Sequence, residues 1–107
     1  MSATDLRGQI DLLLLSVLVA EPAHGYRVIE RLREQSEGAF DLTEGTVYPA
    51  LHRLERSGLL GSSWQEAEGR RRRVYALTAD GEAALAAERS EWKRFAGGIG
   101  QVLGWQA

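Results

Sequence analysis

The fold is decided by positions 43–60, which read Thr43-Glu44-Gly45-Thr46-Val47-Tyr48-Pro49-Ala50-Leu51-His52-Arg53-Leu54-Glu55-Arg56-Ser57-Gly58-Leu59-Leu60. Val47, Leu51 and Leu54 are spaced by four and three positions, so they share one face of a helix over 43–57. Thr43 is placed to cap its first turn, and Gly58 is placed to end it in the left-handed conformation. The stretch therefore predicts one short helix with a buried apolar edge.

The rest of this helix predicts a DNA-binding surface. It carries hydroxyls, an aromatic ring and cations, at Thr43, Thr46, Tyr48, Pro49, His52, Arg53 and Arg56. Such a face suits the DNA major groove, which admits a helix and offers hydrogen-bond partners. We expect Thr46 and Tyr48 to reach phosphates or base edges, and Arg53 and Arg56 to contact phosphates. Two alternatives stay open: core packing for Tyr48, and ion pairs with Glu55 or other acids for the arginines.

Two helices are expected before this one. Residues 5–20 are apolar nearly all round, which is typical of a helix buried on more than one side. Pro22 is expected to end it, because the residue before a proline is pushed out of the helical region. Residues 24–36 predict a second helix with Tyr26 and Ile29 in its core stripe. The short connection that follows is typical of a helix-turn-helix.

A β-hairpin is expected after the third helix. Residues 59–65 and 71–77 suit strands, and the polar segment between them contains a glycine. Four consecutive arginines, Arg70, Arg71, Arg72 and Arg73, follow this turn. Because adjacent cations repel one another without a counter-surface, the run favours phosphate contact over a merely solvated hairpin. Three helices and a hairpin predict a mainly α winged helix, with the hairpin as the wing.

A long helix is expected at 79–103. Thr78 is placed to cap it, and acidic residues in its first turn suit the helix dipole. Its apolar stripe consists of Leu85, Trp92, Phe95, Ile99 and Val102. The glycine-rich segment 97–100 weakens the helix, because each glycine costs about 1 kcal/mol relative to alanine. We therefore expect its last turns to fray in a monomer.

Length and composition place the chain among single-domain proteins. It has 107 residues, a net charge of −2 and no cysteine, so disulfides and cysteine-based zinc sites are excluded. The acidic total means that any DNA-binding surface must be local. No apolar run is long enough for a membrane span, and the N-terminus lacks the features of a signal peptide. We expect a cytoplasmic protein.

Catalytic and metal-binding patterns are absent from the sequence. His24 and His52 are the only histidines, and no third ligand accompanies them. There is no spacing typical of a Ser/His/Asp site and no glycine-rich phosphate loop. The prediction is a protein that is not an enzyme and uses neither cofactor nor metal.

The sequence resembles the PadR-type winged-helix transcriptional regulators over roughly residues 8–103. The matching segments are His24-Gly25-Tyr26, Gly45-Thr46-Val47-Tyr48-Pro49-Ala50-Leu51, Arg53-Leu54-Glu55, Gly58-Leu59-Leu60 and Arg73-Val74-Tyr75-Ala76-Leu77-Thr78-Ala79-Asp80-Gly81. The resemblance implies a homodimeric repressor that binds double-stranded DNA at a palindromic operator. It also implies that the last helix crosses to the partner and that the first helix helps to hold it.

The expected organisation is a DNA-binding domain over 1–78 and a dimerisation helix over 79–107. Residues assigned to the dimer interface are Leu6, Ile10, Leu13, Leu14, Leu85, Trp92, Phe95, Ile99 and Val102. Because some regulators of this type bind aromatic compounds between the two last helices, Trp92 and Phe95 are also candidates for an effector site. Two other functions stay open: a winged helix that binds only protein, and a ligand-sensing protein without specific DNA binding.

Overall fold

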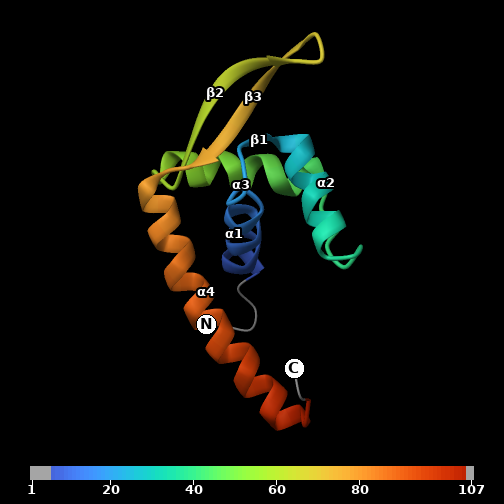
Figure 1. The fold of residues 1–107 in the computed structure, drawn as a ribbon, viewed down its shortest axis with the longest axis vertical. Coiled ribbons are helices and arrows are strands. Elements are labelled where there is room, and N and C mark those ends of the chain that lie inside the picture. The colour runs from blue at the N-terminus through green and yellow to red at the C-terminus, as the bar shows by residue number, and fades with distance from the viewer. Residues whose placement is uncertain (1–5, 106–107) are drawn as a thin grey trace.

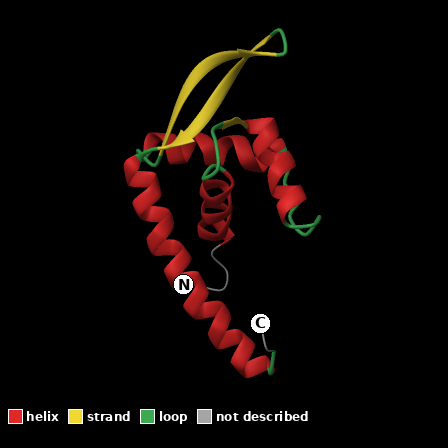
Figure 2. Ribbon diagram, in the orientation of Figure 1, coloured by secondary structure: helices red, strands yellow, loops and turns green. Residues whose placement is uncertain are grey.

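The structure, a computed structural model, describes residues 6–105 (Figure 1). In chain order the elements are α1 (Leu6–Val17), β1 (Ala23–His24), α2 (Gly25–Gln35), α3 (Glu44–Arg56), β2 (Leu60–Ala67), β3 (Arg70–Leu77) and α4 (Ala79–Leu103). Figure 2 shows α1, α2 and α3 gathered beneath the β2–β3 hairpin, with α4 leading away from them. The expected winged-helix class, mainly α with a small β-hairpin, is confirmed.

The hairpin belongs to a three-stranded antiparallel sheet of order β1-β3-β2, so the sequence prediction missed one strand. Ala23 pairs with Tyr75, and His24 pairs with Val74. The prediction that the first helix runs to residue 20 was wrong, since α1 ends at Val17. The N–H group of Leu18 bonds to the Leu15 carbonyl three residues back, which tightens the chain and turns it toward the sheet.

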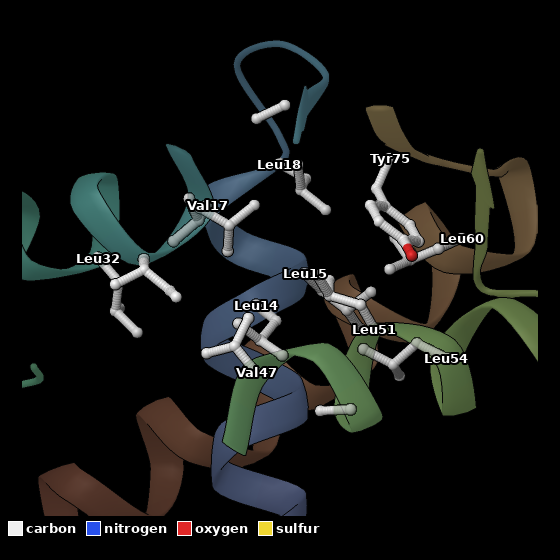
Figure 3. Packing of buried hydrophobic residues seen from close by; sticks show 14 of the residues in the cluster. Leu14, Leu15, Val17, Leu18, Leu32, Val47, Leu51, Leu54, Leu60 and Tyr75 are labelled. Carbon is white, nitrogen blue, oxygen red and sulfur yellow. The ribbon is translucent and has the colours of Figure 1, made fainter. Parts of the chain in front are cut away.

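The core lies where α1, α2 and α3 meet the base of the hairpin (Figure 3). Leu14, Val47 and Leu51 are fully buried, and Leu60 and Tyr75 close the core from the sheet. Each buried leucine contributes about 1.5–3 kcal/mol relative to an exposed one. This core fixes the positions of α3 and the hairpin relative to each other.

Tyr26 was predicted in the core but is 49% exposed. The buried face of α2 is formed by Gly25, Val28, Ile29 and Leu32. Tyr26 follows Gly25 by one position, which rotates it by about 100° from that face. Helical spacing alone did not distinguish these neighbouring directions.

Of the two predicted caps, one is confirmed. The Oγ1 atom of Thr78 accepts a hydrogen bond of 3.0 Å from the Gly81 N–H group. Thr43 occupies the N-cap position of α3, but its side chain makes no cap hydrogen bond. Its hydroxyl instead donates to Oγ1 of Thr46 at 3.3 Å, so the prediction of a side-chain cap there was wrong.

Helices α3 and α4 both run through residues that disfavour helix. Pro49 lies inside α3, and the helix begins with a tight bond of 3.1 Å from the Thr46 N–H group to the Thr43 carbonyl. Helix α4 continues through the glycines at 97–100 and ends at Gly104, whose φ of +79° gives a left-handed cap. The structure shows these turns as helical as far as Leu103.

Candidate nucleic-acid interface

The exposed face of α3 carries most of the residues predicted to contact DNA. Thr43, Thr46, Pro49, His52 and Arg56 are all exposed. The rim of this face meets the sheet where the His52 ring lies 6.5 Å from the Tyr75 ring, centroid to centroid. The core anchors the opposite side of α3 through Val47, Leu51 and Leu54, so the polar side points away from the body of the protein.

Tyr48 differs from these exposed residues, because it is half-buried against the start of α2. A Cβ atom on Gly25 would lie 2.0 Å from Cε1 of Tyr48, so the aromatic ring occupies the space of a missing side chain. Burial raises the pKa of the Tyr48 phenol. Of the two alternatives for Tyr48, packing against the domain is therefore observed. The contact also explains why glycine stands between His24 and Tyr26.

The two arginines of α3 have different surroundings. Arg53 forms an ion pair with Asp11 of α1, and the two side chains are 28% and 26% exposed. Arg56 is exposed and makes no ion pair with any residue of the described range 6–105. Arg53 thus joins α3 to α1, and Arg56 is the α3 arginine that stands open to an outside anion.

The wing is the β2–β3 hairpin, which turns at Glu68 and Gly69 with φ values of +55° and +75°. Two positive φ values in a two-residue loop are typical of the type I′ turn that matches strand twist. The turn fixes the register, in which Arg71 faces Glu66, Arg72 faces Gln65 and Arg73 faces Trp64. All four predicted arginines therefore lie on β3, beside or at the tip of the hairpin.

Trp64 is a residue of this surface that the sequence analysis missed. The guanidinium carbon of Arg71 lies 5.2 Å from the centroid of its ring system, and that of Arg73 lies 5.5 Å away. Cation–π attraction orders the two guanidinium groups and offsets part of their mutual repulsion. The position of the two-residue turn determines that Trp64 pairs with Arg73. The sequence analysis could have found this pair only if it had located the turn at Glu68 and Gly69.

Glu55 links α3 to both strands of the wing. Its carboxylate accepts a hydrogen bond from the Ser62 hydroxyl of β2 and another, of 3.2 Å, from Arg73 of β3. The Ser62 hydrogen bond and the Arg73 guanidinium hold the pKa of Glu55 below its ordinary value. Glu55 is therefore the acid that pairs with an arginine of the wing.

His24 caps α2 close to the wing. Its Nδ1 atom accepts a hydrogen bond of 3.2 Å from the Arg27 N–H group, and Nη1 of Arg72 lies 3.5 Å from the same nitrogen. Burial, followed by the Arg72 charge, lowers the pKa of His24. Among the described residues no group of three His, Cys, Asp or Glu side chains is arranged to hold a metal ion.

The predicted dimer residues differ in their exposure. Leu14 and Leu85 are 0% and 4% exposed, so they belong to the core of the single chain rather than to a surface. Both α1 and α4 have apolar residues on more than one face, and the spacing of these residues did not indicate which face packs in the core of the single chain. Ile10 and Leu13 are partly buried against the core. Leu6 begins α1, but its side chain lies outside the described part of the structure.

The remaining predicted dimer residues form an exposed apolar stripe on α4: Trp92, Phe95, Ile99 and Val102, with exposed fractions of 37%, 37%, 42% and 88%. We call this the α4 stripe. It borders a hollow of about 1000 Å³ that Gly8 of α1 also lines. The rings of Trp92 and Phe95 lie 5.4 Å apart, centroid to centroid.

Comparison with known proteins agrees with this architecture. A protein named transcriptional regulator Rv3488 from Mycobacterium tuberculosis is 43% identical over 75 residues, covering 70% of this chain and 67% of that one. The solved structure of a PadR family transcription regulator from Clostridium difficile is 34% identical, with a TM-score of 0.79 over 88% of this chain and 97% of that one. A transcriptional regulator from Clostridium thermocellum is 29% identical, with a TM-score of 0.80 over 90% and 94% of the two chains.

These relatives are transcriptional regulators rather than enzymes. Within residues 6–105 no helix has the length and apolar character needed to cross a membrane. The model of the transcriptional regulator PadR-like family matches residues 14–87, which include all of α2, α3 and the wing. The chain belongs to the PadR-like family of transcriptional regulators.

Proposed function

We propose that the protein is a homodimeric, sequence-specific repressor that binds a palindromic DNA operator in the cytoplasm. Each copy inserts α3 into the major groove and lays its wing along the adjacent backbone or minor groove. Residues 1–78 are assigned to the DNA-binding part and residues 79–107 to the dimerisation part, in which α4 is the pairing helix.

The observation that carries the proposal is the shared position of two surfaces. Figure 1 shows α3 and the wing at one end of the molecule, away from the C-terminal end of α4. Arg56, Arg70, Arg71 and Arg72 form no ion pairs with carboxylates of the described residues. Unpaired guanidinium groups beside an exposed polar helix face suit a polyanion with a groove.

The α4 stripe supports pairing of two copies. Large apolar side chains on an exposed helix face favour burial against a second apolar surface. A second copy supplies an identical stripe, and the resulting two-fold axis would place two α3 helices on one side of the DNA. Half-sites about one helical turn apart, or a multiple of that, would then be read together.

The direct test is binding to the DNA upstream of the protein's own gene. Fluorescence anisotropy over a salt series would compare that DNA with a shuffled duplex of the same length and composition. We expect tighter binding to the upstream DNA at every salt concentration. The ratio of the affinities for the upstream and shuffled duplexes should stay above one as salt weakens non-specific binding. Equal affinity for both duplexes would leave specific repression by this route unsupported.

The hollow beside Trp92 and Phe95 favours a regulatory ligand as a second element of the proposal. In the dimer, two copies of these rings would enclose a flat aromatic effector, which would change the angle between the DNA-binding parts. Planar phenolic or cationic compounds should then quench tryptophan emission and weaken operator binding. Trp92→Ala should abolish both effects, and quenching that persists in this variant would place the ligand elsewhere.

A further inference from the structure

A network of side chains joins α3 to the exposed part of the wing. It begins at Glu55, whose carboxylate is hydrogen-bonded to Ser62 of β2 and Arg73 of β3. One carboxylate therefore holds both strands of the hairpin to the helix. The Glu55 and Arg73 side chains are 27% and 39% exposed, so water only partly screens their attraction.

The network continues beyond Arg73. Its guanidinium lies against the indole of Trp64, and Arg71 lies against the same ring system. The order of groups is thus carboxylate, guanidinium, indole and guanidinium, so the indole lies between the two guanidinium groups and the carboxylate offsets the charge of Arg73. Arg71 has no ion pair within the described range and stands at the outer end of this order.

We propose that Glu55 and Arg73 are positioning residues that hold the wing at a fixed angle to α3. This inference rests on the proposed DNA-binding function and deepens it. With the angle fixed, Arg71 and Arg72 reach the DNA backbone while α3 occupies the major groove. Arg73 then serves as an internal brace rather than as a phosphate ligand.

The physical case begins with the stability of the hairpin. The core supports the base of the hairpin through Leu60 and Tyr75, and β1 pairs with β3 only at Tyr75 and Val74. Beyond Val74 the hairpin is a two-stranded ribbon, which is marginal in water. Ser62 lies opposite Tyr75, and Arg73 lies two residues beyond Tyr75 along β3, so the Glu55 contacts carry that support outward from the base. A wing held this way loses less conformational freedom when it binds, which favours affinity.

Removing the Glu55 charge changes operator affinity in opposite directions for a bracing role and for simple electrostatic repulsion. A carboxylate near DNA repels phosphates, so its removal should strengthen binding if it does nothing else. Our inference predicts the opposite for Glu55→Gln, which keeps the shape of the side chain but loses its charge. We expect operator affinity to fall roughly tenfold and the salt dependence to flatten as phosphate contacts are lost.

Glu66→Gln is the matched control. Glu66 is an exposed acid on the wing, lies across from Arg71 and has no hydrogen bond to α3 among the described residues. This variant changes the net charge by the same amount, and its affinity should stay unchanged or rise. Tighter operator binding by Glu55→Gln, as by Glu66→Gln, would overturn the inference.

A second variant keeps the inference testable if Glu55→Gln folds poorly. Arg73→Lys retains the positive charge but loses the planar fork that spans the carboxylate and the indole. We expect the same direction of loss, with thermal unfolding still cooperative. The double variant, Glu55→Gln with Arg73→Lys, should bind the operator no more weakly than whichever single variant binds it less tightly. The reason is that both changes remove the same interaction between Glu55 and Arg73.

Unchanged binding by Arg73→Lys, or additive losses in the double variant, would overturn the inference. Failure of the proposed function has a different signature, since the wild-type protein would then not distinguish upstream from shuffled DNA. If the wild-type protein does make that distinction and Glu55→Gln binds more tightly, only the bracing role is wrong.

Discussion

The wing and the C-terminal half of α4 both expose a tryptophan, but in different surroundings. On the wing, Trp64 is 54% exposed and is flanked by Arg71 and Arg73 of the same chain. On α4, Trp92 contacts Phe95 and borders an open hollow. The chain itself organises the wing into a cationic surface, whereas the side chains of the α4 stripe stand exposed in the single chain.

This difference separates the forces expected at the two ends of the molecule. Binding through the wing should depend strongly on salt, because it releases the counterions condensed on DNA. Pairing through the α4 stripe should depend weakly on salt, because each large apolar side chain that is buried contributes about 1.5–3 kcal/mol. Variants of the wing should therefore lose DNA affinity, and variants of the α4 stripe should lose dimerisation.

The largest effect is expected from a charge placed in the α4 stripe. Ile99→Glu would bury an unpaired carboxylate in the proposed dimer, so the dimer dissociation constant should rise by roughly a hundredfold or more. Sedimentation velocity at micromolar concentration would show a monomer. Lys93→Glu introduces the same residue on the other side of α4 and should remain dimeric, so dissociation of both variants alike would argue against the stripe.

The next effect concerns the wing. Arg71→Ala with Arg72→Ala should lower operator affinity by roughly 10–100-fold and reduce the slope of log affinity against log salt by about two, one for each lost phosphate contact. Anisotropy titrations from low to high salt would measure both quantities. Replacing the same two residues by lysine keeps the charges and should largely preserve the slope. An unchanged slope in the alanine variant would show that Arg71 and Arg72 of the wing do not contact DNA phosphates.

Two glycines of α4 distinguish the part of the helix that joins the body from the part that leaves it. A Cβ atom at Gly81 would lie 2.0 Å from the carbonyl oxygen of Leu59, whereas one at Gly97 would meet nothing within 4 Å. Gly81→Ala should lower the free energy of unfolding by about 1–3 kcal/mol, as over-packing does. Gly97→Ala should raise it by up to about 1 kcal/mol through helix propensity. Urea unfolding would measure both, and equal effects would contradict this division.

The smallest effect is the response of the wing brace to acid. The pKa of Glu55 is lowered from its ordinary value of 4.5 in the folded state, so its contribution to stability is present above that pH. The contribution is lost as pH falls below 4.5 through the lowered pKa. Glu55→Gln should therefore show a smaller fall in unfolding midpoint than the wild type between pH 6 and about pH 3. Parallel curves for the two proteins would contradict the lowered pKa.

The sequence predicted the winged-helix elements well because their signals are local. The spacing of Val47, Leu51 and Leu54 identified the buried edge of α3, and the arginine run identified the wing. The strand β1 carried no such signal, since two residues are too few for any period. Tyr26 was wrongly placed in the core because one position along a helix turns the side chain by about 100°, which is enough to move it from the buried face to the exposed one.

The site was harder to predict because its contacts connect distant segments. Arg53 looked like a DNA ligand, but its partner Asp11 lies 42 positions away. Trp64 gained its role only once the turn at Glu68 and Gly69 set the hairpin register. Leu14 and Leu85 were assigned to a dimer surface because periodicity cannot distinguish a core within one chain from a core between two chains.

Hydroxyl-radical footprinting on the DNA upstream of the gene tests the central claim most directly. The account predicts two protected segments related by a two-fold axis, with centres about 10 base pairs apart or a multiple of that. Arg71→Ala with Arg72→Ala should lose protection at the flanks, where the wings lie, before it loses the centre of each half-site. A single unsymmetrical segment, or no protection at concentrations where the protein is dimeric, would contradict the account.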